Sequence, residues 1–435
     1  MQLSIARLAM LTVLSTSCSN AEPFPASADE DVTITLQRTA CYGSCPDYTV
    51  TIDGKGKVRF ATRDAEGPGA AEVHRAFSPD DGVLLSGVHT DSVDPLVVRD
   101  LVAKFRASDF FALKDKYVAP ITDNPSYVLT FRTGTHTKTV VDYVGEEAGM
   151  PASVTALEDA VDRAAGTARW VKGADGLVAY LERTGFDFAS PEARDIALEA
   201  ALGDGAADTT IVGLLGRGAG LDRSANFPTG GHKGTLGKEL TIAALGGGRT
   251  ALFTWLAEHG WVERTGRRAL ETEFAQTAGG CSTALVQAFA ARGLAIDTPG
   301  EEGETALGAL AGAYNCKDDH SRVTVAEALL DLGADPNHRN DAGETAIFEV
   351  EHQPLLDLLY ARGARADITD KEGSSAVFSS WTDAIVLRHL QAGASSKGRY
   401  YDGRSLEEQM KKRPMPLAKQ WLKANDKLRH YPSAP

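Results

Sequence analysis

A glycine that recurs at the ends of leucine-rich segments constrains this chain more than any other feature. The clearest case is Gly333, which follows the apolar segment 328–332 and precedes the loop 334–337. Glycine at such a position can take the left-handed conformation that ends a helix. Successive spacings are 33, 42, 33, 40, 30 and 30 residues along the series Gly185, Gly218, Gly260, Gly293, Gly333, Gly363 and Gly393. One unit of this size cannot bury its apolar face alone, so neighbouring units are expected to stack.

These units resemble ankyrin repeats, whose period is about 33 residues. The best-preserved unit joins Gly333 to an Asp-x-Gly turn at 341–343 and to Thr345, which is expected to start the next helix. Ser375 stands in the same place one unit later, although the family's proline and histidine are absent from both. The resemblance implies an all-α ankyrin-like solenoid over 171–425. Two polar helices at 406–410 and 417–422 are expected to cap it.

The preceding region, 31–170, shows a different pattern. Alternating apolar residues predict strands at 32–36, 48–52, 57–60, 127–131 and 138–143, and helical spacing predicts helices at 96–107 and 152–165. Residues 62–94 carry little pattern and are expected to be a long loop with some strand in it. We therefore predict a multidomain chain that begins with a small α+β domain, in which two helices cover one side of an antiparallel sheet.

The spaced motif Arg38-x-x-Cys41-x-Gly43-x-Cys45-Pro46-x-Tyr48 opens this domain. It resembles the opening of a bacterial exported-domain family that has no assigned function. The strand, Asp-Gly turn and strand that follow also match that family. The resemblance implies a fold but no activity.

The N-terminal segment 1–18 has one positive charge, a short apolar stretch and small residues before Cys18, which is the pattern of a secretory signal. Its end resembles a bacterial lipobox, with Leu14 one position farther from Cys18 than usual. Lipidation of Cys18 is therefore expected, with plain cleavage nearby as the alternative. Residues 19–30 are expected to be a flexible tether and 426–435 a tail. The resulting expectation is a periplasm-facing lipoprotein of the bacterial cell envelope, in the outer membrane.

The other four cysteines are expected to meet an oxidising compartment. Cys41 and Cys45 are four positions apart in a turn before a strand, which favours a structural disulfide. A thiol-redox role and metal binding are the alternatives, but a redox pair usually precedes a helix. Cys281 and Cys316 fall at the same edge of adjacent repeats, so a second disulfide is expected.

Two insertions lengthen the array, and neither predicts chemistry. The glycine-rich segment 223–237 resembles a phosphate loop in composition, but its order is wrong, so a flexible loop is expected. The segment 314–322 holds Cys316, Asp318, Asp319 and His320, for which a solvated loop is a better interpretation than a metal site. The ten histidines form no catalytic arrangement. We expect no enzyme activity, cofactor or metal.

The net charge of -14 argues against general affinity for nucleic acid. The chain is expected to be a monomeric, membrane-tethered scaffold whose solenoid binds another protein. An immunity or inhibitor protein for an exported effector, a thiol-redox protein using Cys41 and Cys45, and ligand binding by the N-terminal sheet are alternatives. Basic residues on the C-terminal cap leave open a membrane-surface or anionic-partner role.

Candidate contacts lie at loop tips, namely Glu301, Glu302, Asn337, Asn340, Asp367, Asp370, Tyr400 and Tyr401. The two tyrosines are expected to be exposed, unless they pack on the cap.

Overall fold

The computed structural model describes residues 24–25, 31–43, 45–63, 75–78, 82–203, 205–225, 234–312, 316 and 318–425. The expected signal segment with Cys18, most of the expected tether, and the tail at 426–435 lie outside these residues. The chain divides into two compact units, Met1–Ala168 and Arg169–Pro435, and each is described by itself. No described helix combines the length and apolar character needed to cross a membrane.

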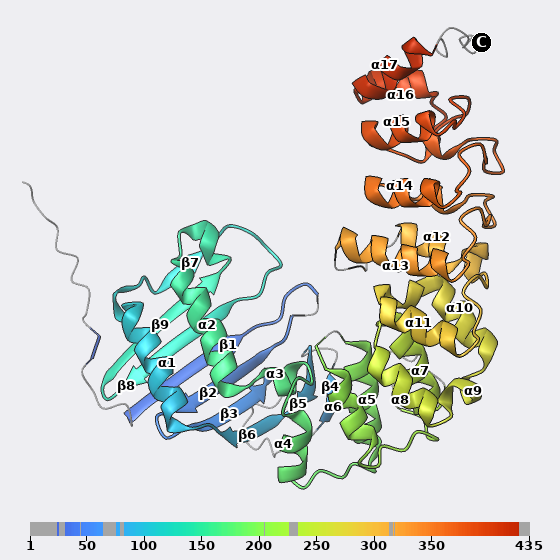
Figure 1. The fold of residues 1–435 in the computed structure, drawn as a ribbon. Helices are drawn as coiled ribbons and strands as arrows, with labels where there is room; N and C mark the ends of the chain where they lie inside the picture. Colours follow the sequence, from blue (N-terminus) through green and yellow to red (C-terminus); the bar gives the residue numbers. More distant parts are fainter. Residues whose placement is uncertain are drawn as a thin grey trace, which may run out of the picture. The chain divides into compact units, whose positions relative to one another are not determined.

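The first unit is built on a seven-stranded sheet with the order β6-β3-β2-β1-β8-β9-β7 (Figure 1). Ile34 in the central strand β1 lies opposite Ile52 on one side and Phe131 on the other, and all three side chains are fully buried. This register follows from the alternation in the sequence, which places every second residue on the core face. The strands are β1 (Val32–Arg38), β2 (Tyr48–Asp53), β3 (Lys57–Thr62), β6 (Val88–Ser92), β7 (Lys116–Val118), β8 (Tyr127–Thr133) and β9 (His136–Tyr143).

The prediction of a purely antiparallel sheet is wrong at one edge, because β7 pairs in parallel with β9. β7 lies at the edge of the sheet beside β9, the second strand of the β8–β9 hairpin, and runs in the same direction as β9. The segment expected to be mostly loop contains β6 and a separate two-stranded sheet of β4 (Arg75–Ser78) and β5 (Val83–Ser86).

Two helices, α1 (Pro95–Ala107) and α2 (Ala152–Ala165), pack against each other on one face of the sheet (Figure 1). Asp94 caps α1 by accepting a hydrogen bond from the Leu96 backbone N–H at 2.9 Å, and Pro95 fixes the first helical position. Short 3-10 helices, η3 (Phe110–Ala112) and η4 (Gly145–Ala148), complete the unit. This arrangement gives a buried layer between the helices and the sheet.

Phe24 also belongs to this layer, although it lies within the expected tether. Its ring centroid is 5.3 Å from that of Phe111 and 5.2 Å from that of Phe131. The Arg106 guanidinium lies over the Phe24 ring at 5.3 Å from its centroid. The tether segment is therefore held to the first unit at this residue.

The second unit consists of helices whose packing forms two series. One series is α5, α7, α10, α12, η7 and η8, and each member contacts the next. The other is α4, α6, α8, α11, α13, α14, α15 and α17, again with each member contacting the next. The chain alternates between the series, with α3 before them, α9 between α8 and α10, η5 and η6 on either side of α11, and α16 before α17 (Figure 1).

The helices of this unit have the following bounds. They are α3 (Ala168–Val171), α4 (Leu177–Arg183), α5 (Pro191–Leu202), α6 (Asp208–Leu215), α7 (Leu236–Gly246), α8 (Thr250–Glu258), α9 (Trp261–Thr265), α10 (Arg267–Thr277), η5 (Ala278–Cys281), α11 (Thr283–Ala291), η6 (Glu301–Gly303), α12 (Ala306–Gly312), α13 (Asp319–Asp331), η7 (Ala346–Phe348), α14 (Gln353–Ala361), η8 (Ala376–Phe378), α15 (Asp383–Gln391), α16 (Leu406–Lys412) and α17 (Pro416–Ala424).

The first helix of two late units is shorter than expected, because η7 and η8 are single 3-10 turns. Neither Thr345 nor Ser375 caps a helix with its side chain. The Ser375 hydroxyl donates instead to the Ser395 carbonyl at 2.7 Å. The apolar residues of both turns are still buried, so they pack in the core although no α-helix forms there.

Candidate functional site

The seven helix-end glycines predicted from the sequence all have positive φ. Each follows a helix of the second series: six stand two residues after the last residue of α4, α8, α11, α13, α14 and α15, and Gly218 stands three residues after the last residue of α6. At Gly333, φ is 97°, and a Cβ atom added there would meet no other atom within 4 Å. The glycine there is needed for its backbone conformation alone.

After these glycines, four loops close with the same backbone hydrogen bond. In each, an N–H donates to the carbonyl four residues later, at 2.8 to 2.9 Å, in the pairs Gly300–Glu304, Asn340–Glu344, Asp370–Ser374 and Tyr400–Arg404. Bonds between turns connect three of them, from Asp341 N–H to the Glu302 carbonyl at 2.7 Å and from Lys371 N–H to the Ala342 carbonyl at 2.9 Å. The turns therefore form a bonded row.

Several predicted contact residues build this row. The Asn337 side chain donates to the Gly363 carbonyl and accepts from the Arg365 N–H. The side-chain oxygen of Asn340 accepts from the N–H groups of Ala342 and Glu344, and the Asp370 carboxylate accepts from the Ser374 N–H at 2.7 Å. These side chains have structural partners.

The remaining predicted contacts lie at the surface. Asp367 is exposed and forms an ion pair with Arg365 at 2.8 Å. Glu301 and Glu302 are exposed on η6. Tyr401 is 86% exposed. These four side chains remain accessible to a partner.

The prediction that Tyr400 is exposed is wrong, since only 2% of it is accessible. Its ring lies 5.3 Å from that of Phe378 and 5.7 Å from that of Trp381, measured between centroids. Tyr400 belongs to the core cluster that includes Leu406 and Leu422 of the last two helices. The alternative interpretation, packing on the C-terminal cap, is confirmed for Tyr400.

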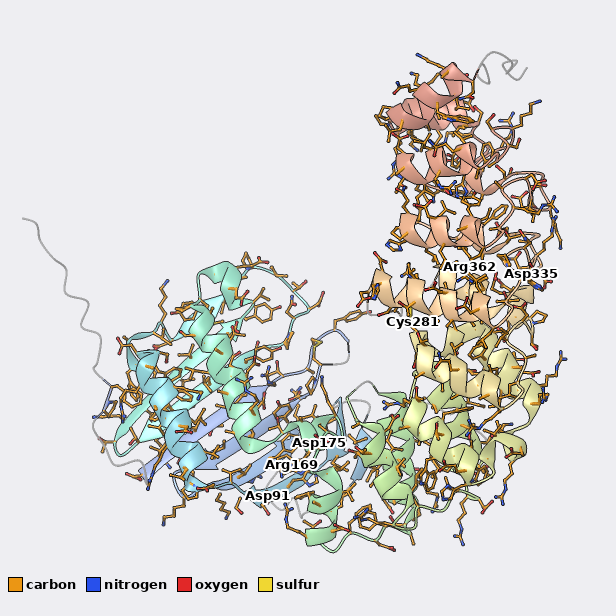
Figure 2. All side chains as sticks on the ribbon, in the orientation of Figure 1. Asp91, Arg169, Asp175, Cys281, Asp335 and Arg362 are labelled. Carbon is orange, nitrogen blue, oxygen red and sulfur yellow. A yellow bond between two sulfur atoms is a disulfide. The ribbon has the colours of Figure 1, made fainter. Side chains whose placement is uncertain are left out.

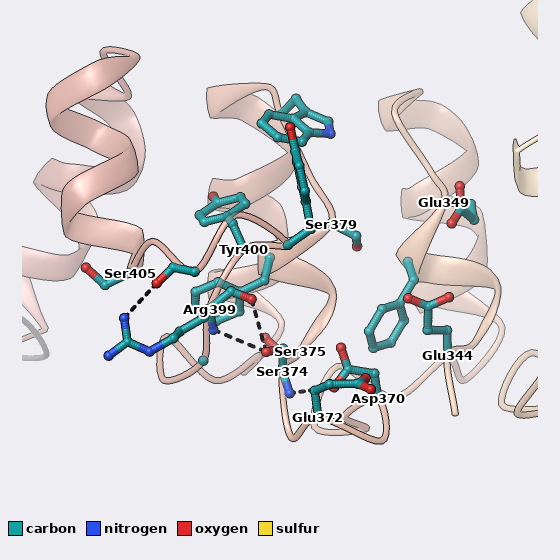
Figure 3. A pocket seen from close by; sticks show the side chains of 16 residues that line it. Glu344, Glu349, Asp370, Glu372, Ser374, Ser375, Ser379, Arg399, Tyr400 and Ser405 are labelled. Atoms are coloured by element: carbon teal, nitrogen blue, oxygen red, sulfur yellow. Dashed lines mark hydrogen bonds between the residues drawn. The ribbon is translucent and has the colours of Figure 1, made fainter. Parts of the chain in front are cut away.

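A groove of about 950 Å³ lies beside the last turns of the row and is lined by residues from three successive units (Figure 3). Ser374 is at its centre, where its N–H donates to Asp370 at 2.7 Å. The Ser374 hydroxyl donates to the Arg399 carbonyl and accepts from the Arg399 N–H, both at 3.2 Å. One serine thus joins the middle turn of the groove to the next turn.

The groove carries more negative than positive charge. Glu344 and Glu349 come from its first unit and Asp370 and Glu372 from the next, whereas Arg399 comes from the last (Figure 3). Burial raises the pKa of Glu344, and neighbouring carboxylates including Glu349 and Asp370 raise it further. This environment favours a cationic group.

Tyr400 adds an unsatisfied polar group to the groove. Burial raises the pKa of its hydroxyl to about 12, with Glu351 adding to the effect. That hydroxyl has no hydrogen-bond partner among the described residues, although Tyr400 lines the groove. Leaving such a group unpaired is unfavourable, so a bound donor or acceptor would stabilise it.

A buried polar cluster holds α2 to the sheet of the first unit. Arg38 donates from Nε to Asp162 at 2.8 Å, and the hydroxyls of Tyr48 and Thr167 donate to the other carboxylate oxygen at 2.7 and 2.8 Å. Burial alone would lower the pKa of Arg38, but the charge and hydrogen bond of Asp162, together with Tyr48 and Tyr127, raise it overall. Burial and Asp162 both raise the pKa of Tyr48. Arg38 and Tyr48 are the outer residues of the Cys-x-x-x-Cys motif, so this part of the motif serves packing.

Glu158 lies deeper in the same layer and is 1% exposed. Its Oε1 atom has no hydrogen-bond partner among the described residues. Burial raises the pKa of Glu158 to about 8, and nearby Asp142 adds to the shift. At neutral pH this side chain is therefore mostly a neutral carboxylic acid. The sequence analysis missed it, although its position beside Leu157 and Val161 on the apolar face of α2 was a signal.

The cysteines pair as predicted, and Figure 2 labels Cys281 in the second unit. Cys41 and Cys45 form one disulfide with Cα atoms 5.5 Å apart, and Cys281 and Cys316 form another with Cα atoms 5.3 Å apart. The chain continues from the first pair into the strand β2 at Tyr48, not into a helix. In the part of the chain that the structure describes, no three His, Cys, Asp or Glu residues are grouped to hold a metal.

The first unit is similar to a known family of domains. Residues 32–165 match the family model described as a domain of unknown function, DUF6438. No curated protein matches the chain. The matched segment runs from β1 to the end of α2 and contains the Arg38–Asp162 cluster and the Cys41–Cys45 disulfide. The chain is thus similar, over its first unit, to a family without an assigned activity.

Proposed function

We propose that this chain is a non-enzymatic protein-binding scaffold, exported to the cell envelope and anchored by a lipid on Cys18. In this proposal the second unit is an ankyrin-like solenoid. The two series of contacting helices, the glycine with positive φ after each of seven helices of the second series, and the bonded row of turns support it. Two disulfides support passage through an oxidising compartment.

The groove beside the last turns carries the proposal. It joins three units, Ser374 hydrogen-bonds two of its turns together, and it places the 86% exposed Tyr401 next to the half-buried Trp381. Large aromatic side chains at a fixed surface supply much of the binding energy at protein interfaces. A preformed groove also reduces the entropy lost on binding.

Site-specific crosslinking tests this function. A photo-reactive phenylalanine analogue replaces Tyr401 in the full chain, and a control chain carries it at Leu332, which is 44% exposed and outside the groove. Irradiation in envelope extracts is expected to join position 401, but not position 332, to a defined protein. An absence of products from both positions, or the same products from both, would contradict the proposal.

The anchor needs a separate test. Cys18→Ser is expected to move the protein from the membrane fraction to the soluble periplasmic fraction and to abolish incorporation of labelled fatty acid. Continued labelling of the variant would show that Cys18 is not the lipidated residue.

A further inference from the structure

We propose that the groove receives an arginine-bearing, extended segment of a partner protein. This inference rests on the proposed binding function and names the chemistry of the partner. Three observations carry it: the charge of the lining, its aromatic side chains and the unpaired Tyr400 hydroxyl.

The charge observation concerns two exposed carboxylates. Glu349 and Glu372 line the groove, and neither has a hydrogen-bond or ion-pair partner among the described residues. Elsewhere the exposed acids of this unit are often paired within the chain, as Asp331 is with Arg362 at 2.6 Å and Asp357 with Arg388 at 2.5 Å. The two glutamates are therefore available to pair with a cation from outside the chain.

The aromatic observation selects a planar cation. The rings of Trp381 and Tyr401 lie 5.8 Å apart between centroids at the rim of the groove. A guanidinium group stacks on aromatic faces and also pairs with carboxylates in its own plane. The same chain already places the Arg388 guanidinium 4.6 Å from the centre of the Tyr360 ring while pairing it with Asp357. Arg413 of the same chain already lies over the Trp381 ring, 5.9 Å from its centroid, so the ring that the groove offers to an arginine from a partner is that of the exposed Tyr401.

The unpaired Tyr400 hydroxyl adds an acceptor. Tyr400, which carries this buried hydroxyl, is 2% exposed and is one of the residues that line the groove. Arginine carries five N–H donors, so one group can satisfy a hydroxyl and a carboxylate together. Because the lining comes from three successive units, an extended segment fits it better than a single compact group (Figure 3).

Fluorescence anisotropy tests the inference with the full chain. The probe is a fluorescein-labelled nonapeptide with the sequence Gly-Ala-Arg repeated three times, and matched peptides carry glutamine, lysine or glutamate in place of arginine. The arginine peptide is expected to bind at least about tenfold more tightly than the glutamine peptide, with the lysine peptide between them. Raising the salt concentration is expected to weaken the binding.

Matched variants locate the binding. Glu349→Gln with Glu372→Gln is expected to weaken binding of the arginine peptide about tenfold. Glu258→Gln with Glu263→Gln removes the same charge at exposed positions outside the groove and is expected to leave binding unchanged. Tyr401→Ala removes an exposed ring and is expected to weaken binding about fivefold. Tryptophan emission and circular dichroism check that each variant is folded.

Equal binding of the arginine and glutamine peptides, equal loss in the two double variants, or no binding of the arginine peptide would overturn the inference. Tighter binding of the lysine peptide would overturn the assignment to arginine, as would displacement of the peptide by an equal concentration of free spermidine. If position 401 still crosslinks to a protein in any of these cases, the proposed function stands and only the partner chemistry is wrong.

Discussion

Loss of the Cys281–Cys316 disulfide should destabilise the second unit strongly, and the structure gives the size of the effect. The bond joins the end of η5 to the segment before α13, across a sequence separation of 35 residues. The loop-entropy relation gives about 4 kcal/mol for a loop of this length. The Cys41–Cys45 bond closes only 4 residues in the first unit, for which the same relation gives about 2 kcal/mol.

The positions of the tryptophans make the test selective. All five, at 170, 255, 261, 381 and 421, belong to the second unit. Their emission during urea unfolding therefore reports on that unit alone. With a slope of about 3 kcal/mol per M of urea, Cys281→Ser with Cys316→Ser should lower the midpoint by about 1.3 M.

The matched control is Cys41→Ser with Cys45→Ser, which should leave the tryptophan midpoint in place. Reduction of the unchanged protein with dithiothreitol should reproduce the shift of the first double variant. A shift of less than about 1 kcal/mol for Cys281→Ser with Cys316→Ser, or an equal shift in the control, would refute the loop-entropy reasoning.

Three further perturbations follow from buried groups and backbone geometry. The folded pKa of about 8 at Glu158 exceeds its ordinary value of 4.5, so the stability that this residue adds is present below pH 4.5 and is lost as the pH rises to 8. Glu158→Gln should flatten this pH dependence of stability in circular-dichroism melts. Arg249 donates to the Ala200, Ala201 and Ala206 carbonyls at 2.7 to 3.0 Å. Arg249→Met should therefore lower the free energy of unfolding, measured in urea, by about 3 kcal/mol or more. A decrease below about 1 kcal/mol would contradict this. Gly333→Ala should cost about 1 kcal/mol through backbone strain alone, measured in the same way.

The parts of the fold that depend on local sequence, such as helical periodicity and helix-end glycines, could be predicted from the sequence. The helix 152–165 was predicted with its observed bounds, because its apolar residues follow a helical period and Gly166 ends it at φ 66°. The seven helix-end glycines were found for the same reason. The disulfides followed from cysteine spacing together with the expected stacking of adjacent units.

The errors arose where tertiary packing decides the structure. The strand β7 has three residues, too few to show a period, and it pairs with β9, which comes later in the chain. Tyr400 and Tyr401 are adjacent in sequence, yet one is 2% and the other 86% exposed, because only Tyr400 points into the core cluster of the cap. The groove was not predicted, since its lining combines residues from three units.

Phe24 sets a limit on the distance between the first unit and a membrane. Only six residue steps separate it from Cys18, and an extended chain spans at most about 3.5 Å per step. With Cys18 lipidated and Phe24 packed against Phe111 and Phe131, the point at which the first unit meets the tether would lie within about 20 Å of the anchored sulfur. That reach is shorter than the roughly 30 Å hydrocarbon core of a bilayer. The part of the first unit around Phe24 would then lie next to the lipid headgroups, and a longer tether would be needed to lift it away from them.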